Sequence, residues 1–116
     1  MTPSQKTVFV IADRPALWLL VDILRSAGYR AIGVGDGAAA GAVLEPLAPD
    51  LVIAAYPGLE EEDADLTGLL LRAAGTTRFR AIALLPSRDD RLAAAALADG
   101  FADVCAQPLA ASDVLV

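Results

Sequence analysis

The sequence predicts a doubly wound α/β fold, in which helices cover both faces of a parallel sheet. Short apolar runs alternate with segments of helical periodicity along the whole chain. The clearest run is Leu51–Ala55, which lies between the breakers Pro49-Asp50 and Pro57-Gly58. A short strand that is apolar on both faces is typical of the centre of a parallel sheet. The alternation itself indicates parallel strands joined by right-handed crossovers.

Four further strands and a first helix are predicted from the remaining patterns. The strands span residues 7–12, 29–34, 80–85 and 103–106. The helix spans residues 15–27, and Gly28 follows it as a C-terminal glycine. At 100° per residue one face of this helix is apolar and should pack on the sheet, and it consists of Leu17, Leu20, Val21 and Leu24.

Three more helices complete the alternation. Residues 38–44 form a weak, short helix because Gly41 and Pro46 disfavour it. Residues 66–74 form a helix after an acidic loop, and a third helix runs to residue 98, with Ser87 as its expected N-cap. The residues from 112 onward are too few for a full final helix. We therefore expect residues 1–116 to be a single domain of a longer protein, with its last helix truncated or short.

Composition excludes several classes of function. The chain has 116 residues, a formal net charge of −6, no histidine and one cysteine. Histidine-based catalysis is excluded, and a zinc site or another metal or cofactor site is not expected. The negative charge argues against direct nucleic-acid binding. Without an apolar run of about 18 residues or a signal-peptide pattern, we expect a cytoplasmic protein with no membrane association.

The carboxyl end of the central strand is where an open α/β sheet normally builds its site. Ala55 and Tyr56 stand there. Alanine offers no acid, hydroxyl, thiol or imidazole at this place. The sequence therefore predicts a sheet without a reactive group at its usual active position, and we expect no enzymatic activity.

Four segments together resemble a bacterial response-regulator receiver domain. They are Val-Phe-Val-Ile-Ala-Asp-Arg-Pro at 8–15, Gly-Asp-Gly-Ala-Ala-Ala at 35–40, Pro-Asp-Leu-Val-Ile at 49–53 and Asp-Gly-Phe-Ala-Asp-Val at 99–104. The resemblance implies a flavodoxin/CheY-like sheet of five parallel strands in the order 2-1-3-4-5. A narrower resemblance, at 73–78 and 106–111, is to the pseudo-receiver of AmiR-type antitermination regulators.

The functional residues of that family do not carry over well. The two acids after the first strand match Ala12 and Asp13, so one survives. The phosphoryl-accepting aspartate falls at Ala55, the hydroxyl that ends the fourth strand at Leu85 and the lysine before the proline of the fifth strand at Gln107. The resemblance thus implies a degenerate phosphorylation pocket, and the chain resembles a pseudo-receiver that cannot be phosphorylated at the usual place.

The favoured function is therefore a regulatory module that acts by protein–protein interaction in bacterial two-component signalling, inside a hybrid histidine kinase or a response regulator. The expected partner is a helical domain of a histidine kinase or a neighbouring domain of the same chain, and a homodimer is a further option. Candidate partner-binding residues are Trp18, Leu19, Ile23, Pro108 and Leu109.

An alternative function is a small-ligand sensor that binds a nucleotide second messenger such as cyclic di-GMP. Arginine suits the planar recognition of anions. Tyr56, next to the position that lacks a reactive group, is placed to stack on a base. Candidate ligand-binding residues are Arg78, Arg80, Arg88, Arg91 and Tyr56. For these arginines an ordinary solvated surface is the favoured interpretation.

Overall fold

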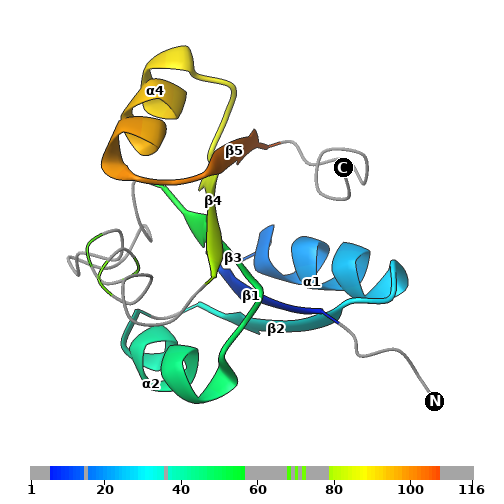
Figure 1. The fold of residues 1–116 in the computed structure, drawn as a ribbon. Coiled ribbons are helices and arrows are strands. Elements are labelled where there is room, and N and C mark those ends of the chain that lie inside the picture. The colour runs from blue at the N-terminus through cyan, green and yellow to red at the C-terminus, as the bar shows by residue number, and fades with distance from the viewer. Residues whose placement is uncertain are drawn as a thin grey trace.

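Five parallel strands form one sheet in the order β2-β1-β3-β4-β5 (Figure 1). The structure, a computed structural model, describes residues 6–14, 16–35, 37–56, 68, 70, 72 and 79–107. The strands are β1 (Thr7–Ile11), β2 (Arg30–Val34), β3 (Leu51–Ala55), β4 (Arg80–Leu85) and β5 (Asp103–Ala106). The predicted fold class and strand order are confirmed.

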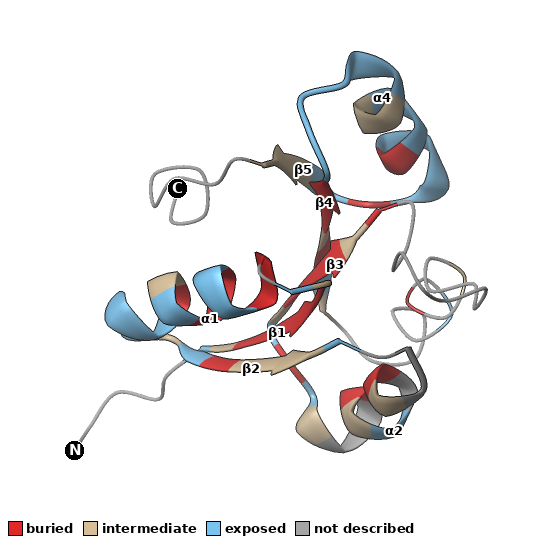
Figure 2. Cartoon of the chain, turned by 180° about the vertical axis from the view of Figure 1, so that it is seen from behind, coloured by how far each residue is buried: buried red, intermediate tan, exposed pale blue. Residues whose placement is uncertain are grey.

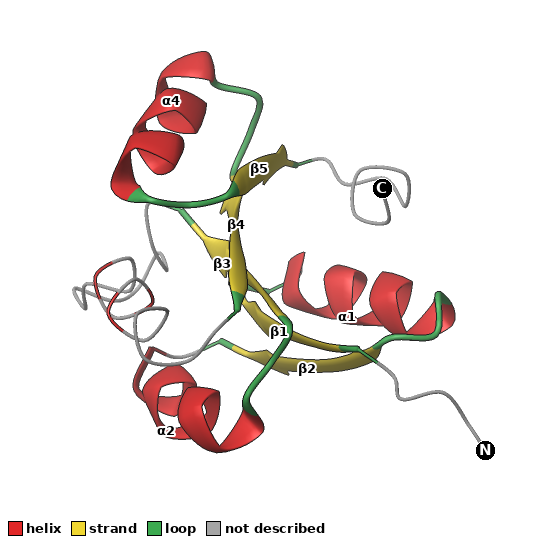
Figure 3. Ribbon diagram, in the orientation of Figure 1, coloured by secondary structure: helices red, strands yellow, loops and turns green. Residues whose placement is uncertain are grey.

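Three helices are described in full, namely α1 (Ala16–Ser26), α2 (Gly37–Leu47) and α4 (Asp90–Asp99) (Figure 3). Of the helix predicted over residues 66–74, only Gly68, Leu70 and Arg72 are described, and each is helical. The predicted short final helix lies outside the described residues. Within the described part of the chain, no helix is both long enough and apolar enough to cross a membrane.

The sheet separates two apolar clusters. On one face α1 packs on the sheet, and the four residues expected on its core side are all buried. On the other face lie α2 and α4, whose cluster includes Phe9, Val52, Leu85 and Phe101 (Figures 1 and 2). The central strands contribute alternate side chains to the two clusters, as a sheet covered on both faces requires.

Two details of the helices differ from the prediction. α2 extends to Leu47 rather than ending near Leu44, because Val43 and Leu47 pack against the core and tertiary contacts outweigh the poor helix propensity of the segment. The N-cap of α4 is Asp89, not Ser87. The backbone of Asp89 is extended, with φ −149° and ψ 109°, and its Oδ1 accepts hydrogen bonds from the amides of Arg91 and Leu92 at 2.9 and 3.2 Å.

The strand register aligns the carboxyl ends of the strands along one edge of the sheet. Ile11 pairs with both Val34 and Ala54, and Leu85 pairs with Ala106. The chain after each of these strands therefore emerges at the same edge, which is the edge where open α/β sheets place their sites.

Candidate functional site

The carboxyl edge of the sheet brings together the five positions that the sequence singled out. Ala12 and Asp13 follow β1, Ala55 ends β3, Leu85 ends β4 and Gln107 follows β5. Hydrogen bonds extend the ladder beyond the strand ends, since the Ala12 amide donates to the Val34 carbonyl at 3.3 Å and the Gln107 amide to the Leu85 carbonyl at 3.1 Å. These residues thus belong to one contiguous edge.

The chemistry of this edge is apolar. Ala12 and Leu85 are each 1% exposed, and both belong to the core clusters. Ala55 is half-buried and packs against the cluster that contains Leu85. A methyl group and an isobutyl group can neither attack a phosphorus atom nor donate a hydrogen bond to a phosphoryl oxygen.

At the carboxyl edge, the polar groups that the structure describes are too few for a cation site. Among the described residues, no group of three or more histidine, cysteine, aspartate or glutamate side chains is placed to hold a metal ion. Asp13 is the one carboxylate among the five positions, and its backbone carbonyl accepts the Leu17 amide at 3.1 Å at the start of α1. A magnesium ion normally takes several oxygen ligands in near-octahedral geometry.

Tyr56 makes specific side-chain contacts at this edge. It is 7% exposed, and its hydroxyl donates a 2.7 Å hydrogen bond to Oδ2 of Asp99 at the end of α4. Its ring meets the ring of Phe101 edge to face, with centroids 5.6 Å apart. The hydrogen bond to the Asp99 carboxylate raises the pKa of Tyr56 above 10.0, and burial and the nearby negative charge act in the same direction. Sequence reasoning missed Asp99 and Phe101, because Asp99-Gly100 has the pattern of an ordinary helix end.

A second feature is an apolar surface on α1. Trp18 and Leu19 are 54% and 47% exposed, and Ile23 is partly buried on the same helix. The guanidinium carbon of Arg14 lies 5.3 Å from the centroid of the Trp18 ring, in a cation–π contact. The other two candidate partner-binding residues, Pro108 and Leu109, lie outside the described residues.

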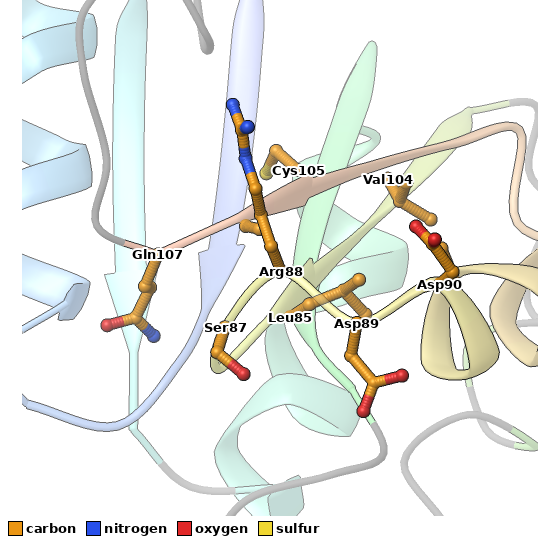
Figure 4. Close-up of a pocket in the computed structure, with 10 residues that line it drawn as sticks. Leu85, Ser87, Arg88, Asp89, Asp90, Val104, Cys105 and Gln107 are labelled. Carbon is orange, nitrogen blue, oxygen red and sulfur yellow. The ribbon is translucent and has the colours of Figure 1, made fainter.

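A pocket of about 740 Å³ opens between the first turn of α4 and strand β5 (Figure 4). Its apolar lining includes Leu85, Ala93 and Val104, and in Figure 4 Ser87 and Gln107 lie on one side of it and Asp90 on the other. The volume is in the range of small-molecule sites. The residues that line it are Leu85, Ser87, Arg88, Asp89, Asp90, Ala93, Val104, Cys105, Ala106 and Gln107.

The candidate ligand-binding arginines do not gather at this pocket. Arg88 lines it. Arg80 begins β4 and therefore lies at the amino ends of the strands, where its amide donates to the Asp50 carbonyl at 3.3 Å. Arg91 is exposed on α4, and Arg78 lies outside the described residues. Tyr56, the fifth member of that set, is buried and bonded to Asp99. Among the described residues, the geometry therefore gives the nucleotide-binding alternative no assembled anion site.

Comparison with known proteins identifies the fold. No family model and no curated protein sequence matches the chain, but solved structures do. The signal receiver domain of a modulated diguanylate cyclase from Desulfovibrio desulfuricans superposes with a TM-score of 0.78 at 25% identity, over 97% of this chain and 88% of that one. A response regulator from Desulfuromonas acetoxidans gives 0.79 at 25% identity, over 92% and 88%. The chain has the receiver fold.

A third neighbour places this fold within a larger protein. NtrX from Brucella abortus superposes with a TM-score of 0.84 at 20% identity, and the match covers 97% of this chain but 25% of NtrX. The receiver-like unit is thus a minor part of that chain. At these identities the superpositions establish the architecture of the sheet, and the residues at its edge have to be judged by their own chemistry.

Proposed function

We propose that this chain is a receiver-like regulatory module that is not phosphorylated and acts by protein–protein contact, as one domain of a longer bacterial two-component signalling protein. The receiver fold supports the regulatory role. The single observation that carries the rest is Ala55, the last residue of β3, because the position where the fold presents its phosphoryl acceptor holds a methyl group.

The neighbouring positions support the same conclusion. Phosphoryl transfer to a carboxylate needs a nucleophilic oxygen, a divalent cation and donors or positive charge on the phosphoryl oxygens. Leu85 is buried and apolar, and Gln107 carries no charge. Asp13 would be a single carboxylate ligand for the cation. Each requirement fails separately, so no one substitution would restore the reaction.

The test is incubation of the chain with acetyl phosphate and Mg²⁺, followed by intact-mass measurement, with beryllofluoride titrated in parallel. We expect the mass to remain unchanged and beryllofluoride to produce no magnesium-dependent change in fluorescence. The chain has one tryptophan, Trp18, so the signal reports on α1 beside the carboxyl edge. An unrelated receiver with its aspartate intact serves as the positive control. A stoichiometric phosphoryl adduct that peptide mapping places on any residue of this edge contradicts the proposal.

The surface that we assign to the partner is the exposed face of α1 that contains Trp18 and Leu19. More than half of the Trp18 surface is exposed, although the same helix buries Leu17, Leu20 and Leu24. Arg14 stacks over the Trp18 ring and restricts it, which reduces the entropy lost on binding. An apolar pair on an exposed helix fits the apolar stripe of a partner helix. We therefore propose a helical domain of a histidine kinase as the partner.

Calorimetry with a purified helical phosphotransfer domain of a histidine kinase from the same organism tests this assignment. Trp18→Ala should weaken binding by about thirtyfold, the effect of a tryptophan at the centre of an interface. Leu97→Ala is the matched control, because Leu97 is 49% exposed on α4, away from α1. If Leu97→Ala weakens binding and Trp18→Ala does not, the partner surface is on α4 and the assignment to α1 is wrong.

A further inference from the structure

Helix α4 is held to the sheet by less apolar surface than α1. Ala96 is its one buried residue, whereas α1 buries five residues, three of them leucines. Figure 2 shows the contrast, since α4 is exposed over most of its surface. Leu92 and Ala93 are only partly buried. Because the free energy of burial scales with the apolar area removed from water, packing alone fixes α4 weakly.

The two ends of α4 are held differently. At its C-terminal end, the Phe101 amide donates to the Ala96 carbonyl at 3.1 Å, and the Phe101 side chain is 4% exposed in the core. The Tyr56 hydroxyl bonds the Asp99 carboxylate at that same end. The N-terminal end instead borders the pocket of about 740 Å³, which Ala93 lines.

We propose that the Tyr56–Asp99 hydrogen bond is a tie between the carboxyl end of β3 and the C-terminal end of α4, and that α4 pivots about this tie, so that its first turns open and close the pocket beside β5. Tyr56 directly follows Ala55. A displacement of the chain at the carboxyl edge therefore moves α4 through a noncovalent contact, with no need for an aspartyl phosphate. The inference goes beyond the proposed function and does not depend on which partner binds.

The proposed link between Tyr56 and α4 is the hydrogen bond rather than the ring contact. The Tyr56 ring rests on Phe101, which belongs to the connection after α4. The hydroxyl bonds a residue of α4 itself, and the acceptor is charged, which makes a stronger hydrogen bond than a neutral one. Removing the oxygen while keeping the ring should release α4 and leave the core packed.

Amide hydrogen exchange of the whole chain, without any partner, tests the inference. In the unchanged chain we expect the amides of Ala94 and Ala95, which bridge the first turn, to exchange faster than those of Ala98 and Asp99. In Tyr56→Phe we expect exchange of the last pair to become about tenfold faster, with β1 and β3 unchanged. Tyr29→Phe is the matched control, because Tyr29 packs against the cluster on the α1 face.

A second variant protects the test against a general loss of stability. Asp99→Ala removes the acceptor from an exposed position and should reproduce the effect of Tyr56→Phe. Because both changes break one bond, the double variant should exchange no faster than either single variant. Unchanged exchange at α4, equal acceleration in every strand or additive effects in the double variant would each overturn the tie. Equal rates along α4 in the unchanged chain would overturn the pivot.

Discussion

Gly33→Ala should destabilise the domain, because Gly33 allows α1 to lie close to β2. A Cβ atom on Gly33 would stand 2.6 Å from Cδ1 of Leu17 and 2.9 Å from Cγ2 of Val21. Both neighbours are buried at 3% exposure on the core face of α1. Val21 is β-branched and has few alternative rotamers, so α1 itself would have to move outward.

The magnitude follows from two opposing terms. Inserting a methyl group into a packed core costs about 1–3 kcal/mol. Replacing glycine with alanine also reduces the entropy of the unfolded chain, which returns about 0.4–1 kcal/mol. We expect the free energy of unfolding to fall by about 1–2 kcal/mol, which lowers the melting temperature of a chain of this size by roughly 3–10 °C.

Urea unfolding followed by the fluorescence of Trp18 on α1 measures this change, and Gly35→Ala is the control. A Cβ atom on Gly35 would meet its nearest neighbour, the Ala12 carbonyl oxygen, at 3.6 Å, which is an ordinary contact. That variant should be as stable as the unchanged chain or more stable by about 0.4–1 kcal/mol. If Gly33→Ala and Gly35→Ala have the same midpoint and the same slope, α1 does not approach β2 as closely as we describe.

Three further predictions concern α4, the pocket and the alternative sensor function. Absorbance titration should show Tyr56 ionising above pH 10. Because the pKa of Tyr56 is higher in the folded chain, its hydrogen bond stabilises the domain fully at pH values below the pKa of Tyr56 in the unfolded chain. This stabilisation is lost as the pH rises through the pKa of Tyr56 in the folded chain. Asp99→Asn should return that pKa toward 10.0. Ala93→Leu should fill part of the pocket and raise the free energy of unfolding by roughly 1 kcal/mol, whereas Ala94→Leu, on the exposed side of α4, should change it little. Cyclic di-GMP at micromolar concentration should leave the melting temperature unchanged, and a shift of several degrees would favour the sensor function.

The strands were the most predictable part of the chain, because each is a short apolar run between turn residues. Leu51–Ala55 and Arg80–Leu85 have the bounds that the sequence predicts, and each contributes buried side chains to both faces of the sheet. A parallel strand covered by helices leaves a continuous apolar run in the sequence, which no alternating surface strand does. The glycine after α1 was equally informative, since Gly28 has a φ of +95°.

Helix ends were less predictable where two residues compete for one role. Ser87 and Asp89 are both good N-caps, and the choice depends on which of them has the extended backbone when the helix packs on the sheet. The end of α2 depended on whether Leu47 reaches the core, which is a property of the packed domain rather than of the segment.

The candidate site likewise has one part that the sequence predicts and one part that it does not. The register of a parallel sheet places Ala55, Leu85 and Gln107 at one edge once the strands are known, so their proximity follows from the sequence pattern. The Tyr56–Asp99 contact joins residues 43 positions apart through side chains alone, and no pattern in the sequence encodes it. Arg80 and Arg88 are close in sequence but belong to opposite ends of β4, so charge density along the chain did not indicate a shared surface.

In the part of the chain that the structure describes, the carboxyl edge of this sheet has the apolar composition and burial of a core. Functional sites usually retain polar or strained groups that reduce stability, and they are the places where local rules fail. Here Ala12, Leu85 and Tyr56 are buried, and among the described residues no buried polar side-chain atom lacks a hydrogen bond. An aspartate introduced at residue 55 would therefore face an apolar cluster and one remaining acid, with its charge neither paired nor coordinated. On the proposed function, a signal that crosses this edge passes through packing and through the hydrogen bond from Tyr56 to α4.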